Sequence, residues 1–197
     1  KTNVYVSVVK GYVLPKTVNP NTLVITISVS GDTEETLTIL KEAHEKNCKI
    51  IAIEPDPNTF KILSKNLELN NLENVTLHNI AISEENGNVK LFKSETHSGT
   101  SSILSKSDSK NESILIKSLT LDNFLGNSYK KIDWLKIDVE GSELFVLKGA
   151  SNTLKITSKI IIELHEEILN QNNQSSKEII DILTNNNFKI TTFNEYW

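Results

Sequence analysis

The first eighty residues alternate between β-prone apolar runs and helical segments, and this alternation constrains the fold more than any other feature. The runs 23–27, 49–54 and 75–80 predict buried strands. The segments between them, about 33–46 and 58–70, are expected to be helices. Strands that alternate with helices predict a parallel sheet with right-handed crossovers and helices on both faces.

The rest of the chain continues this pattern less regularly. Asn86-Gly87, between 81–82 and 89–92, is typical of a β-hairpin turn. The polar segment 93–113, which contains His97, is expected to be a long exposed loop that contributes to acceptor binding through 98–109. Further strands are expected at 113–118, 132–138, 159–165 and 188–193, and helices at 120–125, at 175–183 and from about Gly141 onward.

Length and composition limit the class of protein. A chain of 197 residues fits one domain with a sizeable core, expected at 23–197 after a lead-in loop and peripheral strand at 1–22. The net charge is −4 and no arginine occurs, so general nucleic-acid binding is not expected, because it relies on phosphate neutralisation and favours Arg. Cys48 has no cysteine partner and no run of eighteen apolar residues occurs, so we expect a cytoplasmic protein with no membrane partner.

Three carboxylates crowd the end of the strand at 132–138: Asp138, Glu140 and Glu143. Open α/β sheets bind their ligands at the carboxyl ends of strands, so this turn is a candidate for chemistry. Alternatively, Glu140 and Glu143 only shape and cap the helix that follows, through its macrodipole. The latter role suits these two residues better, whereas Asp138 is expected to point toward the site.

Glu54 closes the second strand of the alternating series. An acid at that place in a doubly wound sheet can accept hydrogen bonds from both hydroxyls of an adenosine ribose. The turn 28–32 after the first strand would then lie beside the rest of the cofactor. The alternative is that Glu54 is simply a strand end.

Five blocks of sequence add context to these single signals. They are 54–60, 65–70, 79–81, 118–122 and 136–150, and the most specific part is Lys-Ile-Asp-Val-Glu-Gly at 136–141. In this order they resemble the FkbM family of S-adenosylmethionine-dependent O-methyltransferases. The resemblance implies a class I methyltransferase fold, which is an α/β Rossmann-like fold with a mostly parallel sheet. It also implies S-adenosyl-L-methionine as cofactor and methyl transfer to a hydroxyl of a small molecule or glycan.

The resemblance also implies roles for individual residues. Glu54 would hold the ribose, and Asn79 with Ala81 and Ile82 would flank the adenine. The residues expected to bind the cofactor are Ser28, Ser30, Gly31, Asp32, Glu54, Pro55, Asn79, Ala81 and Ile82.

The first loop departs from the family pattern, Asp-x-Gly-Ala-x-x-Gly. If Gly31 is its last glycine, Ile25, Ile27 and Ser28 stand where Asp, Gly and Ala are expected. Either Asp32 or another acid substitutes, or the cofactor binds weakly, or the chain is a non-catalytic binding module with a degenerate cofactor loop. A nicotinamide oxidoreductase is less favoured, because no Gly-x-Gly-x-x-Gly follows the first strand.

Strand geometry suggests an acceptor site. Side chains alternate across a strand, so Lys136 and Asp138 share a face, as Glu163 and His165 would on the next strand. These four residues are the predicted catalytic set. His165 is the expected base because the unperturbed pKa of histidine lies near neutrality, and Asp138 would orient it or hold the hydroxyl.

Two alternatives stay open for these side chains. His165 could instead be an exposed residue that begins a helix with Glu166 and Glu167. Asp138, Glu163 and His165 could also offer a divalent metal one imidazole and two carboxylates, although no spacing signature supports such a site.

Overall fold

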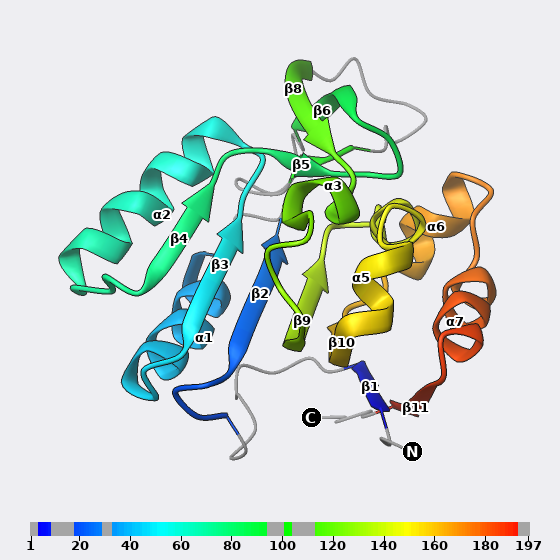
Figure 1. Ribbon diagram of the computed structural model, residues 1–197. Helices are drawn as coiled ribbons and strands as arrows, with labels where there is room; N and C mark the ends of the chain where they lie inside the picture. Colours follow the sequence, from blue (N-terminus) through cyan, green and yellow to red (C-terminus); the bar gives the residue numbers. More distant parts are fainter. Residues whose placement is uncertain (1–3, 9–17, 29–32, 94–100, 104–112, 193–197) are drawn as a thin grey trace.

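A seven-stranded parallel sheet forms the centre of the protein (Figure 1). The computed structural model describes residues 4–8, 18–28, 33–93, 101–103 and 113–192. The strands of this sheet are β1 (Val4–Val8), β2 (Leu23–Ser28), β3 (Lys49–Ile53), β4 (Val75–His78), β9 (Ile132–Asp138), β10 (Thr157–Ile162) and β11 (Phe188–Thr192). Their order across the sheet is β11-β1-β10-β9-β2-β3-β4, and each neighbouring pair is parallel.

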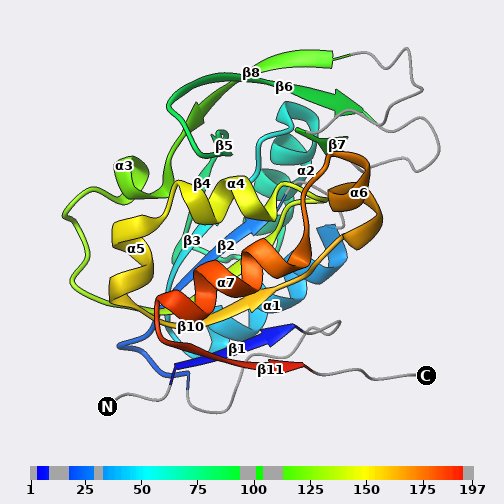
Figure 2. The same ribbon diagram turned by 90° about the vertical axis from the view of Figure 1, so that its right-hand side faces the viewer.

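Helices cover both faces of the sheet (Figure 2). They are α1 (Thr33–Glu45), α2 (Pro57–Leu69), α3 (Leu121–Leu125), α4 (Glu143–Lys148), α5 (Ser151–Ile156), α6 (Glu166–Gln171) and α7 (Ser176–Asn185). One hydrophobic cluster joins α1 and α2 to side chains such as Val24 and Ile50, and the other joins α4, α5 and α7 to side chains such as Ile25 and Ile137. The predicted α/β class and its helices on both faces are confirmed. In the described part of the chain, no helix has both the length and the apolar character needed to cross a membrane.

Local sequence explains where α2 begins. The Asp56 carboxylate accepts hydrogen bonds from the backbone amides of Asn58 at 2.7 Å and Thr59 at 3.4 Å, and Pro57 occupies the first turn. Both features are typical of helix starts. The same cap holds the start of α2 against the end of β3, at the edge where open α/β sheets generally bind ligands.

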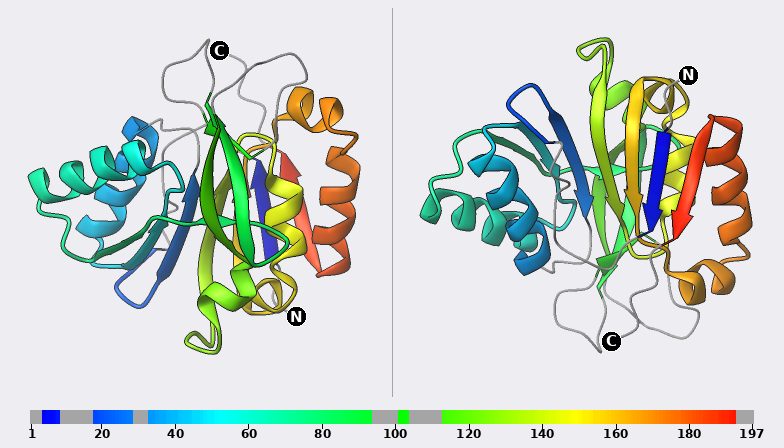
Figure 3. Two further views of the ribbon diagram at one scale, coloured as in Figure 1. Left: turned by 90° about the horizontal axis from the view of Figure 1, so that it is seen from above. Right: turned by 90° about the horizontal axis from the view of Figure 1, so that it is seen from below.

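Strand β1 differs from the peripheral strand expected for the first residues. It lies inside the sheet between β10 and β11, with Tyr5 paired to Lys159 on one side and to Lys189 on the other (Figure 3, right). The β-prone run predicts a strand correctly, but its composition does not distinguish an edge position from an interior one. The division of the chain at residue 22 stays a prediction.

A second sheet of four strands covers the carboxyl end of the first (Figure 3, left). Its strands are β5 (Ala81–Ile82), β6 (Gly87–Lys93), β7 (Ser101–Ser102) and β8 (Ser113–Leu119), in the order β5-β8-β6-β7. The predicted hairpin at Asn86-Gly87 is wrong, because β8 inserts between β5 and β6 and pairs with both. The expected loop 93–113 contains β7, while His97 and most of the loop lie outside the described residues.

Two of the family-like blocks form one structural unit. The Asp122 carboxylate accepts hydrogen bonds from the amides of Asn152 and Thr153 at 2.8 and 2.7 Å, so it caps the start of α5. The Asp122 amide in turn donates to the carbonyl of Gly149 at 3.0 Å. A Cβ atom on Gly149 would lie 2.2 Å from the carbonyl oxygen of Ser83, so only glycine fits there. Asp122 and Gly149, at the ends of these two blocks, therefore join the second sheet to α5 and have a structural role.

Candidate active site

Polar side chains gather where β2, β3 and β9 end. Ser28 is the last residue of β2 and pairs in register with Asp138, the last residue of β9. Glu54 directly follows β3, the neighbour of β2 on its other side. All three are buried. The structure thus brings together three residues that the sequence assigned to one site, whereas Ser30, Gly31 and Asp32 lie outside the described residues.

Glu54 is a buried acid with an unusual proton affinity. Its side chain is 2% exposed, and its Oε1 accepts a hydrogen bond from the Asp56 amide at 2.9 Å. Burial raises the pKa of Glu54 to about 8, with the charges of Asp56 and Asp138 adding to the rise and the hydrogen bond from Asp56 opposing it. Glu54 therefore holds a proton at neutral pH, at a strand end where a ligand's hydroxyls could meet it.

The segment after β4 is tied to the end of β3. The Asn79 side chain donates hydrogen bonds to the carbonyls of Glu54 at 2.8 Å and Pro55 at 2.9 Å, so Asn79 lies beside Glu54. Ala81 and Ile82 are fully buried in the hydrophobic core. Their expected place beside an adenine stays a prediction.

Lys136 and Asp138 point to the same face of β9, as alternation predicts. Lys136 Nζ donates to Asp138 Oδ2 at 2.7 Å, and both side chains are almost completely buried. In the adjacent strand, Thr26 pairs in register with Lys136 and faces the same side, and its buried Oγ1 has no hydrogen-bond partner among the described residues. The ion pair keeps Asp138 at the edge of the sheet with a fixed orientation.

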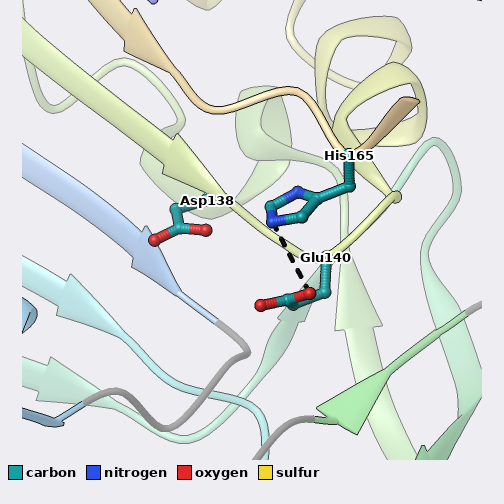
Figure 4. Close-up of side chains that lie close together, drawn as sticks. All are labelled: Asp138, Glu140 and His165. Carbon is teal, nitrogen blue, oxygen red and sulfur yellow. Dashed lines mark ion pairs between the residues drawn. The ribbon is translucent and has the colours of Figure 1, made fainter. Parts of the chain in front are cut away.

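His165 reaches this edge from another element (Figure 4). Strand β10 ends at Ile162, so His165 lies beyond the strand, at the N-cap position of α6. The side chain is 19% exposed; its Nδ1 lies 2.8 Å from Glu143 Oε1, and its Nε2 lies 3.5 Å from Glu140 Oε2. The residue begins a helix, as one alternative proposed, yet its ring faces the carboxylates.

The pKa of His165 contradicts the expectation that it lies near neutrality. Burial lowers this pKa, but the hydrogen bond to Glu143 and the charges of Glu140, Glu143 and Asp138 outweigh burial and raise it to about 9. The ring is therefore protonated at neutral pH in this arrangement. The sequence placed Asp138 and Glu163 beside His165, whereas Glu140, Glu143 and Asp138 surround it, and these three charges were not foreseen together.

Glu140 and Glu143 have roles that the sequence did not reveal. Both Glu140 and Gly141 adopt positive φ, 49° and 92°, so the turn after β9 is left-handed and α4 starts two residues later than expected. Glu143 is completely buried and accepts hydrogen bonds from the Gly141 amide at 3.0 Å and from His165. It shapes the turn, as predicted, but it also orients the histidine ring.

Asp138, Glu140 and His165 form a cluster, with one potential ligand atom from each within 4.8 Å of the others. The sequence had placed Glu163 in the position that Glu140 takes. Glu163 is half-buried, and its amide donates to the Ile137 carbonyl at 3.1 Å, which extends the β9–β10 pairing by one residue. The only sequence feature that pointed to Glu140 was its place two residues after Asp138. No sequence feature connected Glu143 to His165, which lies 22 residues further along the chain.

Comparisons with known proteins define the class. A crystal structure of methyltransferase FkbM from Methylobacillus flagellatus superposes with a TM-score of 0.52 at 18% identity, covering 84% of this chain and 38% of that one. This likeness and the sheet order define a Rossmann-like methyltransferase fold. The model of the Methyltransferase FkbM domain family matches residues 21–190. The chain therefore belongs to the FkbM methyltransferase family.

Two curated relatives have matching sequences. Methyltransferase 1 of Beauveria bassiana is 27% identical over 135 residues, which are 58% of this chain and 54% of the relative. Hexuronic acid methyltransferase AglP of Haloferax volcanii is 30% identical over 118 residues, which are 59% of this chain and 47% of the relative. The matched regions thus span about half the length of either relative.

Proposed function

We propose that this chain is an S-adenosylmethionine-dependent O-methyltransferase that acts on a hydroxyl of a small molecule or glycan. The observation that carries the proposal is the buried Glu54 at the carboxyl end of β3, in a domain of the FkbM family. Asn79 fixes the backbone around Glu54, so the carboxyl is presented in one orientation. A hexuronic acid methyltransferase among the relatives supports a sugar-type acceptor.

The proposed chemistry needs few protein groups. The acceptor oxygen attacks the methyl carbon of the sulfonium in line, the carbon–sulfur bond breaks, and S-adenosylhomocysteine and the hydroxyl proton are released. Positioning of the two reactants supplies most of the acceleration, and proton removal adds a factor on the order of 10² to 10⁴. Asp138 and Glu140 offer carboxylate oxygens to the acceptor hydroxyl. Lys136 and His165 position these carboxylates through the contacts at 2.7 and 3.5 Å.

The competing proposal is a non-catalytic binding module, and the packing of β2 favours it in one respect. Ile25 and Ile27 are buried in the hydrophobic cluster on one face of β2, while Thr26 and Ser28 lie on the other face, the side of Asp138. A family acid that contacts the cofactor from β2 would therefore stand at Thr26. In this chain that position holds a hydroxyl, so the positive methionine end of the cofactor lacks this acidic partner.

Calorimetry with S-adenosylmethionine tests the leading proposal. We expect saturable binding by the wild-type chain and at least tenfold weaker binding by Glu54→Ala. Glu68→Ala, an exposed acid near the other end of α2, serves as the matched control and should bind like wild type. If the wild-type chain shows no saturable binding at millimolar S-adenosylmethionine, the proposal is refuted.

A double variant separates the two proposals. Thr26→Asp combined with Ser28→Gly restores an acid and a glycine on the face of β2 that meets the site. A large gain in cofactor affinity over a wild type that binds barely or not at all supports the decayed binding module. Little change over a wild type that already binds supports the enzyme.

A further inference from the structure

We propose that Asp138, Glu140 and His165 bind a divalent cation of the Mn²⁺ type. The three side chains come from the end of β9, the turn after it and the residue before α6, and they converge on one point (Figure 4). One ligand atom of each lies within 4.8 Å of the others. Opposite ligands of an octahedral ion stand about 4 to 5 Å apart, depending on the ion, so the cluster has the spacing of a cation site.

A carboxylate orients the His165 ring, as is common for histidines that bind metals. Its Nδ1 is engaged by Glu143 Oε1 at 2.8 Å, which directs Nε2 toward Glu140 and the centre of the cluster. A carboxylate on the far nitrogen fixes the tautomer and orientation of a ligating imidazole and makes it a stronger ligand. Glu143 is thus the outer-shell partner of the proposed site.

A second, independent observation concerns Glu143 itself. Its side chain has no exposed surface, and its Oε2 has no hydrogen-bond partner among the described residues. A buried carboxylate with one oxygen unsatisfied is costly unless positive charge lies nearby. Without metal, the protonated His165 ring supplies that charge, and a cation that displaces the Nε2 proton would supply it instead.

Without metal, a protonated His165 pairs with both Glu143 and Glu140, but the two contacts are unequal. The Glu143 contact to His165 is 2.8 Å, a normal length for a charge-assisted hydrogen bond, but the Glu140 contact is 3.5 Å. The looser spacing lies on the Nε2 side, toward Glu140 and Asp138. A cation between these atoms would bond to each of them at closer range than they bond to one another.

The ligand set selects the type of cation. Carboxylate oxygens suit Mg²⁺, Ca²⁺ and Mn²⁺, whereas imidazole suits later transition metals, so a mixed set with one imidazole favours Mn²⁺. Three protein ligands leave coordination positions open, and an acceptor hydroxyl could take one and become more acidic there. That last consequence rests on the proposed methyl transfer, whereas the cation site does not.

Titration with Mn²⁺ alone, followed by electron paramagnetic resonance of free Mn²⁺, tests the site. We expect one ion per wild-type chain and at least tenfold weaker binding by Glu140→Gln. Glu166→Gln is the matched control, since Glu166 is an exposed acid next to His165, and it should bind like wild type. Thermal melting followed by circular dichroism checks that each variant folds, and His165→Asn replaces Glu140→Gln if the latter does not.

Three results would overturn the cation site: no saturable binding of Mn²⁺ up to millimolar concentration, equal binding by wild type and Glu140→Gln, or equal losses in Glu140→Gln and Glu166→Gln. Calorimetry with S-adenosylmethionine in a chelator reports on the proposed function separately. Cofactor binding without Mn²⁺ binding refutes only the cation site, and Mn²⁺ binding without cofactor binding refutes only the methyl transfer.

Discussion

Replacing Glu54 with glutamine should remove a pH-dependent cost from the folded state. Burial raises the pKa of this carboxyl from 4.5 to about 8. Between these values the folded chain keeps a proton that the unfolded chain has lost, so the contribution of Glu54 to stability is present below pH 4.5 and is lost as pH rises to 8. At 1.36 kcal/mol per pKa unit, the loss between pH 5 and pH 9 is on the order of 4 kcal/mol.

Urea unfolding at several pH values measures this effect through the fluorescence of buried Trp134. Because glutamine does not titrate, the free energy of unfolding of Glu54→Gln should rise relative to wild type by that amount from pH 5 to pH 9. Glu68→Gln, which changes an exposed acid, should run parallel to wild type. A constant difference between wild type and Glu54→Gln across this pH range would refute the reasoning.

Three further predictions concern residues around the site. Asp122→Ala removes the cap of α5 and should lower stability by about 2 kcal/mol in thermal melts, with a smaller loss for Asp122→Asn; an unchanged melting temperature would contradict the capping role. Gly149→Ala forces a methyl group to within 2.2 Å of the Ser83 carbonyl oxygen and should lower the free energy of unfolding in urea by about 3 kcal/mol or more; an unchanged free energy of unfolding would contradict this. Lys136→Met leaves Asp138 buried without its cation and should cost about 3–5 kcal/mol, and a neutral effect would show that Asp138 does not depend on this pair.

Most of the fold could be predicted from the alternation of strands and helices in the sequence. The local sequence predicts strands at the apolar runs around Ile25 and Ile51, and it predicts a helix with Leu63 and Leu67 on its apolar side. The tertiary structure keeps these elements and buries these side chains. Local and global preferences agree in these elements, so their sequence positions were predicted to within a few residues.

Predictions failed where a distant segment decides the structure. The Asn86-Gly87 turn is a local hairpin signal, but β8, about thirty residues further along the chain, takes the pairing positions on both sides. The position of β1 between β10 and β11 likewise depends on partners more than 150 residues away in sequence. Short-range patterns contain no information on such pairings.

The candidate site was predicted only in part, because some of its contacts also depend on distant segments. Glu54 and Asp138 follow directly from strand ends, and alternation along β9 places Lys136 beside Asp138. The contacts of His165 depend on the left-handed turn at Glu140 and on the burial of Glu143, which the strand pattern does not encode. The same turn makes Glu140 a partner of His165 and delays the start of α4.

Transfer of a labelled methyl group tests the central claim most directly. Folded wild-type chain is incubated with methyl-labelled S-adenosylmethionine and a panel of hydroxylated small molecules and glycans, including uronic acids, and the products are analysed by mass spectrometry. The account predicts one labelled methyl group on a hydroxyl oxygen of an acceptor, lost in Glu54→Ala and retained in Glu68→Ala. A wild-type chain that binds the cofactor but methylates no acceptor hydroxyl, or an equal yield from Glu54→Ala, would contradict it.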